Sequence, residues 1–211
     1  MFNKKISHNV NNYLHINICG CRNLASVAIH SDFITTLPSR IFYYSAIKSI
    51  ELPESIKVID RYAFQSCYYL ETIYIPKGLE SVGTEAFDGA DAIHTIYYGG
   101  SEGDWANISV VDYHNDVLKL ATKVYNYVKP SAGLAFEINS DGTSYSVTGL
   151  GKCTDTDIAI LSEHNRLPVT HIASGSFAGT AITSVIIPDS VTHIGNSAFE
   201  LCRNITSLSC L

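Results

Sequence analysis

Residues 47–69 read IKSIELPESIKVIDRYAFQSCYY, and residues 70–92 read LETIYIPKGLESVGTEAFDGADA. The two stretches are copies of one pattern, and residues 182–204 (ITSVIIPDSVTHIGNSAFELCRN) repeat it near the end of the chain. Each copy is 23 residues long. Self-similarity at a fixed period in this range is typical of solenoid proteins, in which each copy forms one layer of a stack.

The apolar positions of the copies define the expected layer. They are Ile47, Ile50, Leu52, Ile56, Ile59 and Phe64 in the first copy, Leu70, Ile73, Ile75, Leu79, Val82 and Phe87 in the second, and Ile182, Val185, Ile187, Val191, Ile194 and Phe199 in the third. Apolar and polar residues alternate over the start of each copy, which predicts a short half-buried strand. Pro53, Pro76 and Pro188 then end the strand because proline cannot donate to a ladder. The Ala-Phe pair is expected in a tight helical turn. Only stacked neighbours can seal both faces of such a layer.

Weaker copies extend the pattern over most of the chain. Residues 1–23 are expected to form a degenerate cap, and residues 24–46 a further repeat. The copy that begins at Ile93 fails halfway, where Trp105 is expected to close the stack and residues 117–128 to supply a closing strand. We therefore expect a first block over residues 1–128.

A second block is expected to follow a short linker. Residues 129–133 (KPSAG) have the composition of a joint between two blocks. Residues 134–211 then open with an expected β-hairpin around Asp141-Gly142, a strong turn signal. The chain ends one strand into a new repeat, and we expect that this strand could pair edge to edge with another copy.

Composition and charge exclude several functions. The net charge is −6 and no cluster of Lys and Arg is present, which argues against binding of nucleic acid. No apolar stretch approaches the length of a membrane span. The N-terminus has a basic start without an apolar segment behind it, so no secretory signal is expected.

The six cysteines are interpreted mainly as reduced core thiols. Cys67 and Cys202 occupy the same position after the Ala-Phe turn, and Ala90 fills this position in the middle copy. Cys21 is expected two layers from Cys67, about 10 Å away, which is beyond the reach of a disulfide. The spacings do not match a zinc site, so no metal site and no cofactor are predicted.

The wording IPDSVTHIGNSAFELC over residues 187–202 resembles the BspA-type leucine-rich repeat. Residues 148–160 resemble a segment that often opens such arrays, and residues 97–105 resemble the way in which they often close. The resemblance implies a mostly β, leucine-rich-repeat-like solenoid: short parallel strands stack into a narrow sheet, with turns and short helical segments on the opposite side. It also implies a secreted or cell-surface location and a role in adhesion and protein binding.

The outward positions of the strands supply the candidate binding residues. One column consists of hydroxyl residues: Ser26, Ser49, Thr72, Thr95, Ser184 and Ser207. Tyr74 and Tyr97 belong to the next column and would lie about 5 Å apart as an exposed aromatic pair near Glu51. Lys48, Glu71 and His94 lie beside them. Cross-strand packing that only stabilises the sheet is the alternative interpretation of the two tyrosines.

No catalytic motif is found, and no catalytic residue is predicted. The sequence lacks a nucleophile elbow, a zinc-protease motif and a phosphate-binding loop. A thiol enzyme at Cys153, with Asp155, Asp157 and His164 nearby, is a remote alternative. His171 and His193 recur with the repeat, which favours a stacked surface pair over a metal site.

These observations predict a non-catalytic module that recognises a protein or a glycan, as part of an adhesin-like surface protein. The alternative from another class is a structural spacer without a ligand of its own.

Overall fold

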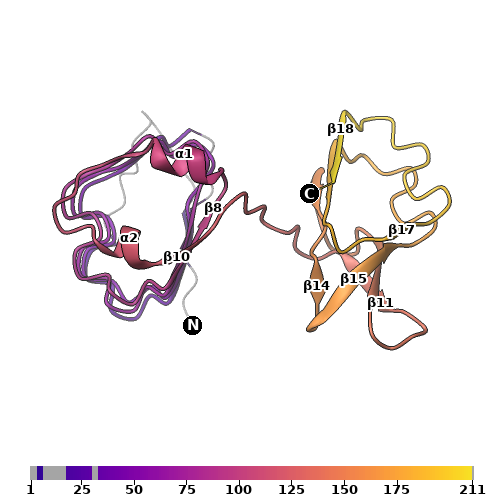
Figure 1. Cartoon of the computed structure of the whole chain (residues 1–211), viewed down its shortest axis with the longest axis horizontal. Coiled ribbons are helices and arrows are strands. Elements are labelled where there is room, and N and C mark those ends of the chain that lie inside the picture. The colour runs from indigo at the N-terminus through magenta and orange to yellow at the C-terminus, as the bar shows by residue number, and fades with distance from the viewer. Residues whose placement is uncertain (1–3, 7–17, 30–32, 211) are drawn as a thin grey trace. The chain divides into compact units, whose positions relative to one another are not determined.

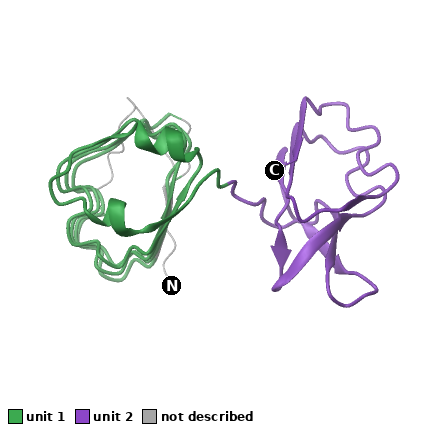
Figure 2. Ribbon diagram, in the orientation of Figure 1, with its two compact units in different colours: residues 1–127 green, residues 128–211 purple. Residues whose placement is uncertain are grey.

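The computed structural model describes residues 4–6, 18–29 and 33–210 (Figure 1). The chain forms two compact units, residues 1–127 and residues 128–211 (Figure 2). Most of the cap predicted over residues 1–23 lies outside the described residues. Within the described part, neither helix has the length and apolar character that crossing a membrane requires.

Unit 1 is a solenoid with a parallel sheet along one side. The strands of this sheet, in spatial order, are β1 (Lys4–Ile6), β2 (Ser26–Ile29), β4 (Ser49–Glu51), β6 (Thr72–Ile75), β8 (Thr95–Tyr98) and β10 (Thr122–Val124). Neighbouring strands pair at equivalent repeat positions, so that Ile50 aligns with Ile73 and Ile73 with Ile96. Spatial order follows the order of the copies, which confirms the predicted stack.

A second parallel sheet lies on another side of unit 1, where turns and short helices were expected. It contains β3 (Thr36–Leu37), β5 (Val58–Ile59), β7 (Ser81–Val82) and β9 (Ser109–Val110). Its strands are only two residues long, so no alternation could be read from them. The Ala-Phe segments are hydrogen-bonded turns, not helices. Equivalent main-chain groups of successive layers lie close enough to pair, and a ladder therefore forms on this side too.

The core of unit 1 contains a column of phenylalanine rings. Phe64 lies between Phe42 and Phe87, with ring centroids 5.1 Å and 5.0 Å away and the ring planes nearly parallel. All three side chains are fully buried or nearly so. One aromatic ring per layer thus joins the layers, as the repeat predicts.

The closing segment of unit 1 differs from the prediction. Residues 117–128 were expected to form a strand, but Val117–Leu120 forms a short helix, α2. Within this segment only β10 is a strand, and it pairs with β8 on the side away from β6. The N–H of Ala121 donates to the carbonyl of Val117, and this turn buries Val117 and Leu118 at the end of the stack. The other helix, α1 (Glu102–Ala106), has a capping box at Ser101 and places Trp105 against the ring of Tyr98 at 5.2 Å.

Unit 2 begins with an antiparallel strand pair and continues with repeats. Its strands are β11 (Ala135–Ile138), β12 (Tyr145–Gly149), β13 (Asp157–Ala159), β14 (Glu163–His164), β15 (Leu167–Ile172), β16 (Ser184–Ile187), β17 (His193–Ile194) and β18 (Ser207–Cys210). One sheet has the order β11-β12-β15-β14, with β17 also paired to β15, and a second has the order β13-β16-β18. Phe177 and Phe199 stack at 5.5 Å. Ser131, within the expected linker, is buried in this unit and bonds to Ala159.

The cysteines are less buried than predicted. Only Cys67 and Cys153 lie in the core, Cys202 is half-buried, and Cys19, Cys21 and Cys210 are exposed. The prediction was wrong for these three because they lie in the outermost layers, where a neighbouring repeat does not cover them. The thiols of Cys67 and Cys202 donate to the carbonyls of Phe42 and Phe177 in the preceding layers, at 3.1 and 2.8 Å.

Candidate functional site

The candidate residues lie on the outward face of three neighbouring strands, β4, β6 and β8. Pairing in register places Ser49, Thr72, Thr95 and Thr122 in one row across the sheet. The next outward row contains Glu51, Tyr74 and Tyr97. The hydroxyl row predicted from the copies therefore exists, and β10 extends it by one residue.

The aromatic part of this face is a cluster of three tyrosines. The ring of Tyr127 lies 5.6 Å from the ring of Tyr74 and 4.6 Å from the ring of Tyr97. Tyr74 and Tyr97 are half-buried, and not fully exposed as expected, because Tyr127 packs against both. Tyr127 follows β10, and its N–H donates to the carbonyl of Tyr98 at 2.9 Å. No repeat marks Tyr127 in the sequence, because the copy that contains it is broken.

Tyr74 is fixed by a carboxylate of the preceding layer. Its hydroxyl donates a short hydrogen bond to Glu54, a residue that the sequence analysis did not select. Burial and then the bond to Glu54 raise the pKa of Tyr74 well above its ordinary value. Gly99 leaves room for this hydroxyl, since a Cβ there would lie 3.0 Å from it. The hydroxyl therefore remains protonated and serves as a donor.

Glu51 adds negative charge beside the cluster. It is the register partner of Tyr74 on the neighbouring strand and is half-buried. The pKa of Tyr127 is raised by burial first, and then by the charges of Tyr97 and Glu51. The polar rim of the tyrosine cluster thus carries carboxylates rather than cations.

Lys48, Glu71 and His94 form an exposed row at the beginning of the same strands. The N–H of Glu71 donates to the carbonyl of Lys48 at 2.8 Å, and the N–H of His94 donates to that of Glu71 at 3.1 Å. Nδ1 of His94 lies 2.9 Å from Oγ1 of Thr95. The structure therefore brings the six predicted residues into two rows, one directly before the three strands and one within them, with the hydroxyl row between the two.

Among the residues suggested for a thiol enzyme, Asp157 and His164 contact other residues. Cys153 is buried, and its N–H donates to the carbonyl of Leu150. The carboxylate of Asp157 accepts from Thr183 and Ser184 at 2.7 and 2.6 Å. The ring of His164 stacks on Phe136 at 4.4 Å. Among the described residues, moreover, no group of three or more His, Cys, Asp or Glu side chains is suited to hold a metal ion.

The remaining predicted features concern unit 2. The rings of His171 and His193 stack at 4.5 Å with an angle of 6° between their planes, as expected from the repeat. The last strand, β18, pairs with β16 on one side and its residues are exposed. Pairing between copies through β18 stays a prediction.

Comparison with known proteins identifies the repeats. A family model for the BspA-type leucine-rich repeat region matches six copies over residues 7–108 and 152–210, which is more than half of the chain. No protein with a curated description matches significantly.

Three similar solved structures include two leucine-rich proteins. A leucine-rich cell surface protein from Faecalibacterium prausnitzii shares 22% identity, with a TM-score of 0.35, over 91% of this chain and 43% of its own. A leucine-rich repeat protein from Bacteroides ovatus shares 20% identity, with a TM-score of 0.38, over 90% and 56%. The pneumococcal vaccine antigen PcpA shares 18% identity, with a TM-score of 0.28, over 84% and 56%.

The chain thus spans about half the length of these solved proteins. The repeat model is the decisive match, since the residues that it matches include layers of both units. The chain belongs to the BspA-type leucine-rich repeat family.

Proposed function

We propose that the chain is a non-catalytic recognition module whose outward face on β4, β6 and β8 binds a protein or glycan ligand. The tyrosine cluster is the observation that supports this proposal. Three rings gather there on a parallel sheet, in which β4, β6 and β8 each pair with a strand on both sides. Tyrosine provides a large contact area at a small cost in conformational entropy, and rigid presentation lowers the cost of binding further.

Charge gives this face its specificity. Glu51 lies in the tyrosine row, and Lys48, Glu71 and His94 form an exposed row on the other side of the hydroxyl row. Charged groups around an aromatic centre select partners by complementarity and contribute less to the affinity itself. Members of the family are typically surface or secreted proteins, and we extend that location to this chain as part of the proposal.

A structural spacer is the second candidate, and one observation favours it. The hydroxyl of Tyr74 is already bonded to Glu54, and the rings of Tyr74 and Tyr97 pack on Tyr127. The same cluster would result if its task were only to close the outer surface of unit 1. The test must therefore separate binding from packing.

The experiment screens immobilised extracellular-matrix proteins and glycans with the full chain. Any ligand found is then measured with the variants Tyr97→Ala and Lys48→Glu/Glu71→Lys, since the second variant changes exposed charges and leaves the rings in place. We expect each variant to weaken binding by about tenfold or more. Tyr113→Ala is the matched control, because Tyr113 is exposed (58%) and lies outside this face.

Two results would contradict the proposal. A ligand that binds every variant as tightly as the unmodified chain does not use this face. If the screen finds no ligand, although circular dichroism shows that the chain is folded, the spacer is favoured.

A further inference from the structure

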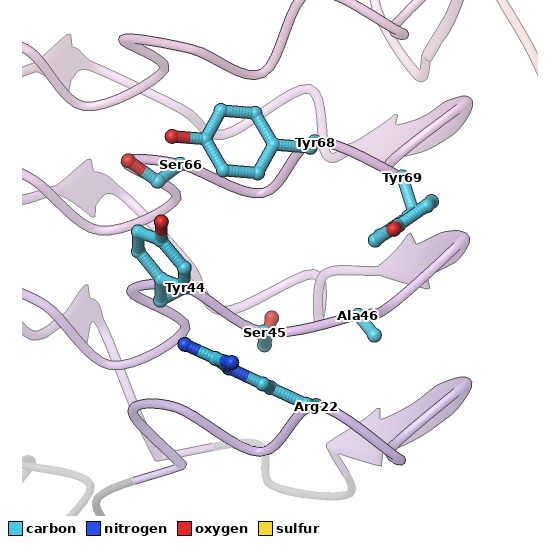
Figure 3. A pocket seen from close by; sticks show the side chains of 7 residues that line it. All are labelled: Arg22, Tyr44, Ser45, Ala46, Ser66, Tyr68 and Tyr69. Carbon is cyan, nitrogen blue, oxygen red and sulfur yellow. The ribbon is translucent and has the colours of Figure 1, made fainter.

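A second candidate site lies away from the strand face, at the turn that follows the phenylalanine of each layer. Three successive layers of unit 1 enclose a hollow of about 290 Å³ there (Figure 3). The first layer contributes Arg22, the second Tyr44, Ser45 and Ala46, and the third Ser66, Tyr68 and Tyr69. We call it the tyrosine–arginine hollow.

The layers on both sides of the hollow make the same closed turn. The N–H of Leu24 donates to the carbonyl of Cys21, and the N–H of Leu70 donates to the carbonyl of Cys67, at 3.2 and 3.0 Å. Two residues stand between donor and acceptor in each case. These turns project Arg22 from one layer and Tyr68 from the other.

The middle layer is one residue shorter at this point. Only Ala46 separates Ser45 from Ile47, the first buried residue of the next copy. The N–H of Ala46 donates to the carbonyl of Cys21 in the preceding layer instead of closing a turn of its own. The main chain of the middle layer therefore lies further in at this turn than that of its neighbours, and Ser45 and Ala46 form the floor of the hollow. The concave surface thus arises because this turn has one residue fewer than the equivalent turns of the adjacent layers.

Exposed tyrosine rings form the walls. Tyr44, Tyr68 and Tyr69 are 37%, 51% and 60% exposed, although the chain has a core in which other aromatic residues are fully buried. The rings of Tyr44 and Tyr68 meet edge to face at 5.5 Å. Figure 3 shows Tyr68 across one side of the hollow, with Tyr69 at its other end. Clustered exposed rings around a hollow are typical of a binding surface.

Arg22 provides a positive charge at the edge. Its guanidinium carbon lies 5.4 Å from the centre of the Tyr44 ring. In the described part of the chain, no carboxylate lies within ion-pair distance of Arg22. A positive group without a carboxylate partner is notable in a chain with a net charge of −6. The cation–π contact with Tyr44 leaves the N–H groups of the guanidinium able to bind an anion.

Hydroxyl groups complete the lining. Ser66 and the hydroxyls of Tyr44 and Tyr68 lie together on one side of the hollow (Figure 3). The hydrogen bond with Tyr68 raises the pKa of Tyr44, so the phenol of Tyr44 remains protonated at neutral pH. Each of these hydroxyls can both donate and accept a hydrogen bond.

Unit 2 shows that the fold does not require the rings. It contains the same shortened join, in which only Ala181 separates Thr180 from the buried Ile182. Gly179 stands there in the place of Tyr44, with a φ angle of 68° against 58°. The turn is therefore made without an aromatic residue, and the tyrosines of unit 1 need another explanation.

We infer that the tyrosine–arginine hollow binds a sugar unit that carries a carboxylate, such as a uronic acid. Its volume is at the small end for ligand pockets and suits a single ring. The tyrosine faces can pack against the apolar face of the sugar ring, the hydroxyls match its hydroxyls, and Arg22 binds its carboxylate in the bidentate manner. A peptide would need a sheet edge or an extended groove, whereas this hollow is bounded by a layer on each side.

The experiment titrates the full, isotope-labelled chain with D-glucuronic acid, D-glucose and a blocked Gly-Glu-Gly peptide, and follows the amide signals by NMR. We expect saturable shifts at Ser45, Ala46 and Ser66 with glucuronic acid, and affinity at least about tenfold weaker for glucose. Arg22→Gln should remove the difference between the two sugars. Tyr68→Ala should weaken both sugars by about tenfold, and Tyr113→Ala should weaken neither.

Each contrary result overturns a named part of the inference. Absence of saturable shifts with glucuronic acid excludes the site. Equal affinity for glucose, or no effect of Arg22→Gln, excludes recognition of the carboxylate. Binding of the acidic peptide as tightly as glucuronic acid excludes a sugar site. Tyr97→Ala should leave glucuronic acid binding unchanged, so that failure here is distinguishable from failure of the strand-face proposal.

Discussion

The side-chain oxygen of Asn115 accepts a hydrogen bond from the main-chain N–H of Phe87 at 3.0 Å. In the two preceding layers, the equivalent N–H groups of Phe42 and Phe64 donate to main-chain carbonyls of the following repeat, at 3.0 and 2.7 Å. A side chain of the broken copy therefore replaces a main-chain carbonyl at this position. The amide nitrogen of Asn115 also donates to the carbonyls of Gly83 and Val111, at 2.9 and 2.7 Å. Together with Val117 and Leu118, this buried residue closes the stack.

Asn115→Ala should destabilise unit 1 more than its size suggests. The substitution leaves the buried N–H of Phe87 without its partner, which costs about 1–3 kcal/mol, and it also removes the hydrogen bonds to the carbonyls of Gly83 and Val111. Urea unfolding followed by the fluorescence of Trp105, the only tryptophan, measures the loss in this unit. Asn107→Ala is the control, because the side chain of Asn107 donates to Gly103 at an exposed position. Equal stability of the two variants would contradict the capping role.

Phe64→Ala should be among the most damaging substitutions in the chain. The ring is fully buried between Phe42 and Phe87, so its removal leaves a cavity between two layers and costs about 3–5 kcal/mol. Phe199→Ala provides the comparison in unit 2, where the ring is half-buried and stacks on Phe177. We expect a smaller loss for Phe199→Ala, measured by the far-ultraviolet circular dichroism of the unfolding transition. A larger loss at Phe199 would show that the column does not join the layers.

Gly83→Ala should destabilise unit 1, although the glycine lies at a turn. A Cβ at Gly83 would lie 2.6 Å from the main-chain nitrogen of Arg61 in the preceding layer, and that backbone cannot move without disturbing the stack. We expect a cost of about 1–3 kcal/mol. Gly78→Ala is the matched control, since a Cβ there would meet only the carbonyl of Glu54 at 3.6 Å. Thermal unfolding of the two variants side by side decides the matter, and an equal loss would argue against close approach as the cause.

The stability of unit 1 should fall between pH 9 and pH 11, in part because of Cys67. Burial raises the pKa of the Cys67 thiol from 9.0 to about 11. In this range the thiol ionises in the unfolded chain and stays neutral in the folded one, so rising pH favours unfolding, by about 2 kcal/mol at most. Cys67→Ala should reduce the slope of stability against pH, and it should be tolerated because Ala90 fills the same position in the next layer.

Alkylation gives an independent measurement of the same property. Iodoacetamide should modify the exposed Cys21 and Cys210 at neutral pH, while Cys67 reacts only after unfolding. Mass spectrometry of the digested chain reports each site. Rapid modification of Cys67 in the folded chain would contradict its burial.

Much of the fold and part of the candidate site could be predicted from the copies. Their spacing placed Tyr74 beside Tyr97 and put Lys48, Glu71 and His94 in one row, because strands of a solenoid pair at equivalent positions. The sequence did not reveal Tyr127, which covers both tyrosines, since it lies in a broken copy. Nor did it indicate the second sheet, whose two-residue strands are too short to show alternation.

The sequence by itself determined the layer: its length, the phenylalanine column and the six apolar positions, because each copy must bury the same face against its neighbours. All six positions are buried in the two copies of unit 1, but in the copy of unit 2 Ile194 is exposed, and Val191 and Phe199 are half-buried. Only the tertiary structure decided how the stack of unit 1 is closed and where its surface is hollowed. The bond from Phe87 to Asn115 joins residues that no repeat relates, and the hollow at Ala46 exists because the two adjacent layers have one more residue at this turn. Periodicity fixes what is common to all layers, whereas function depends on the places where one layer differs from the next.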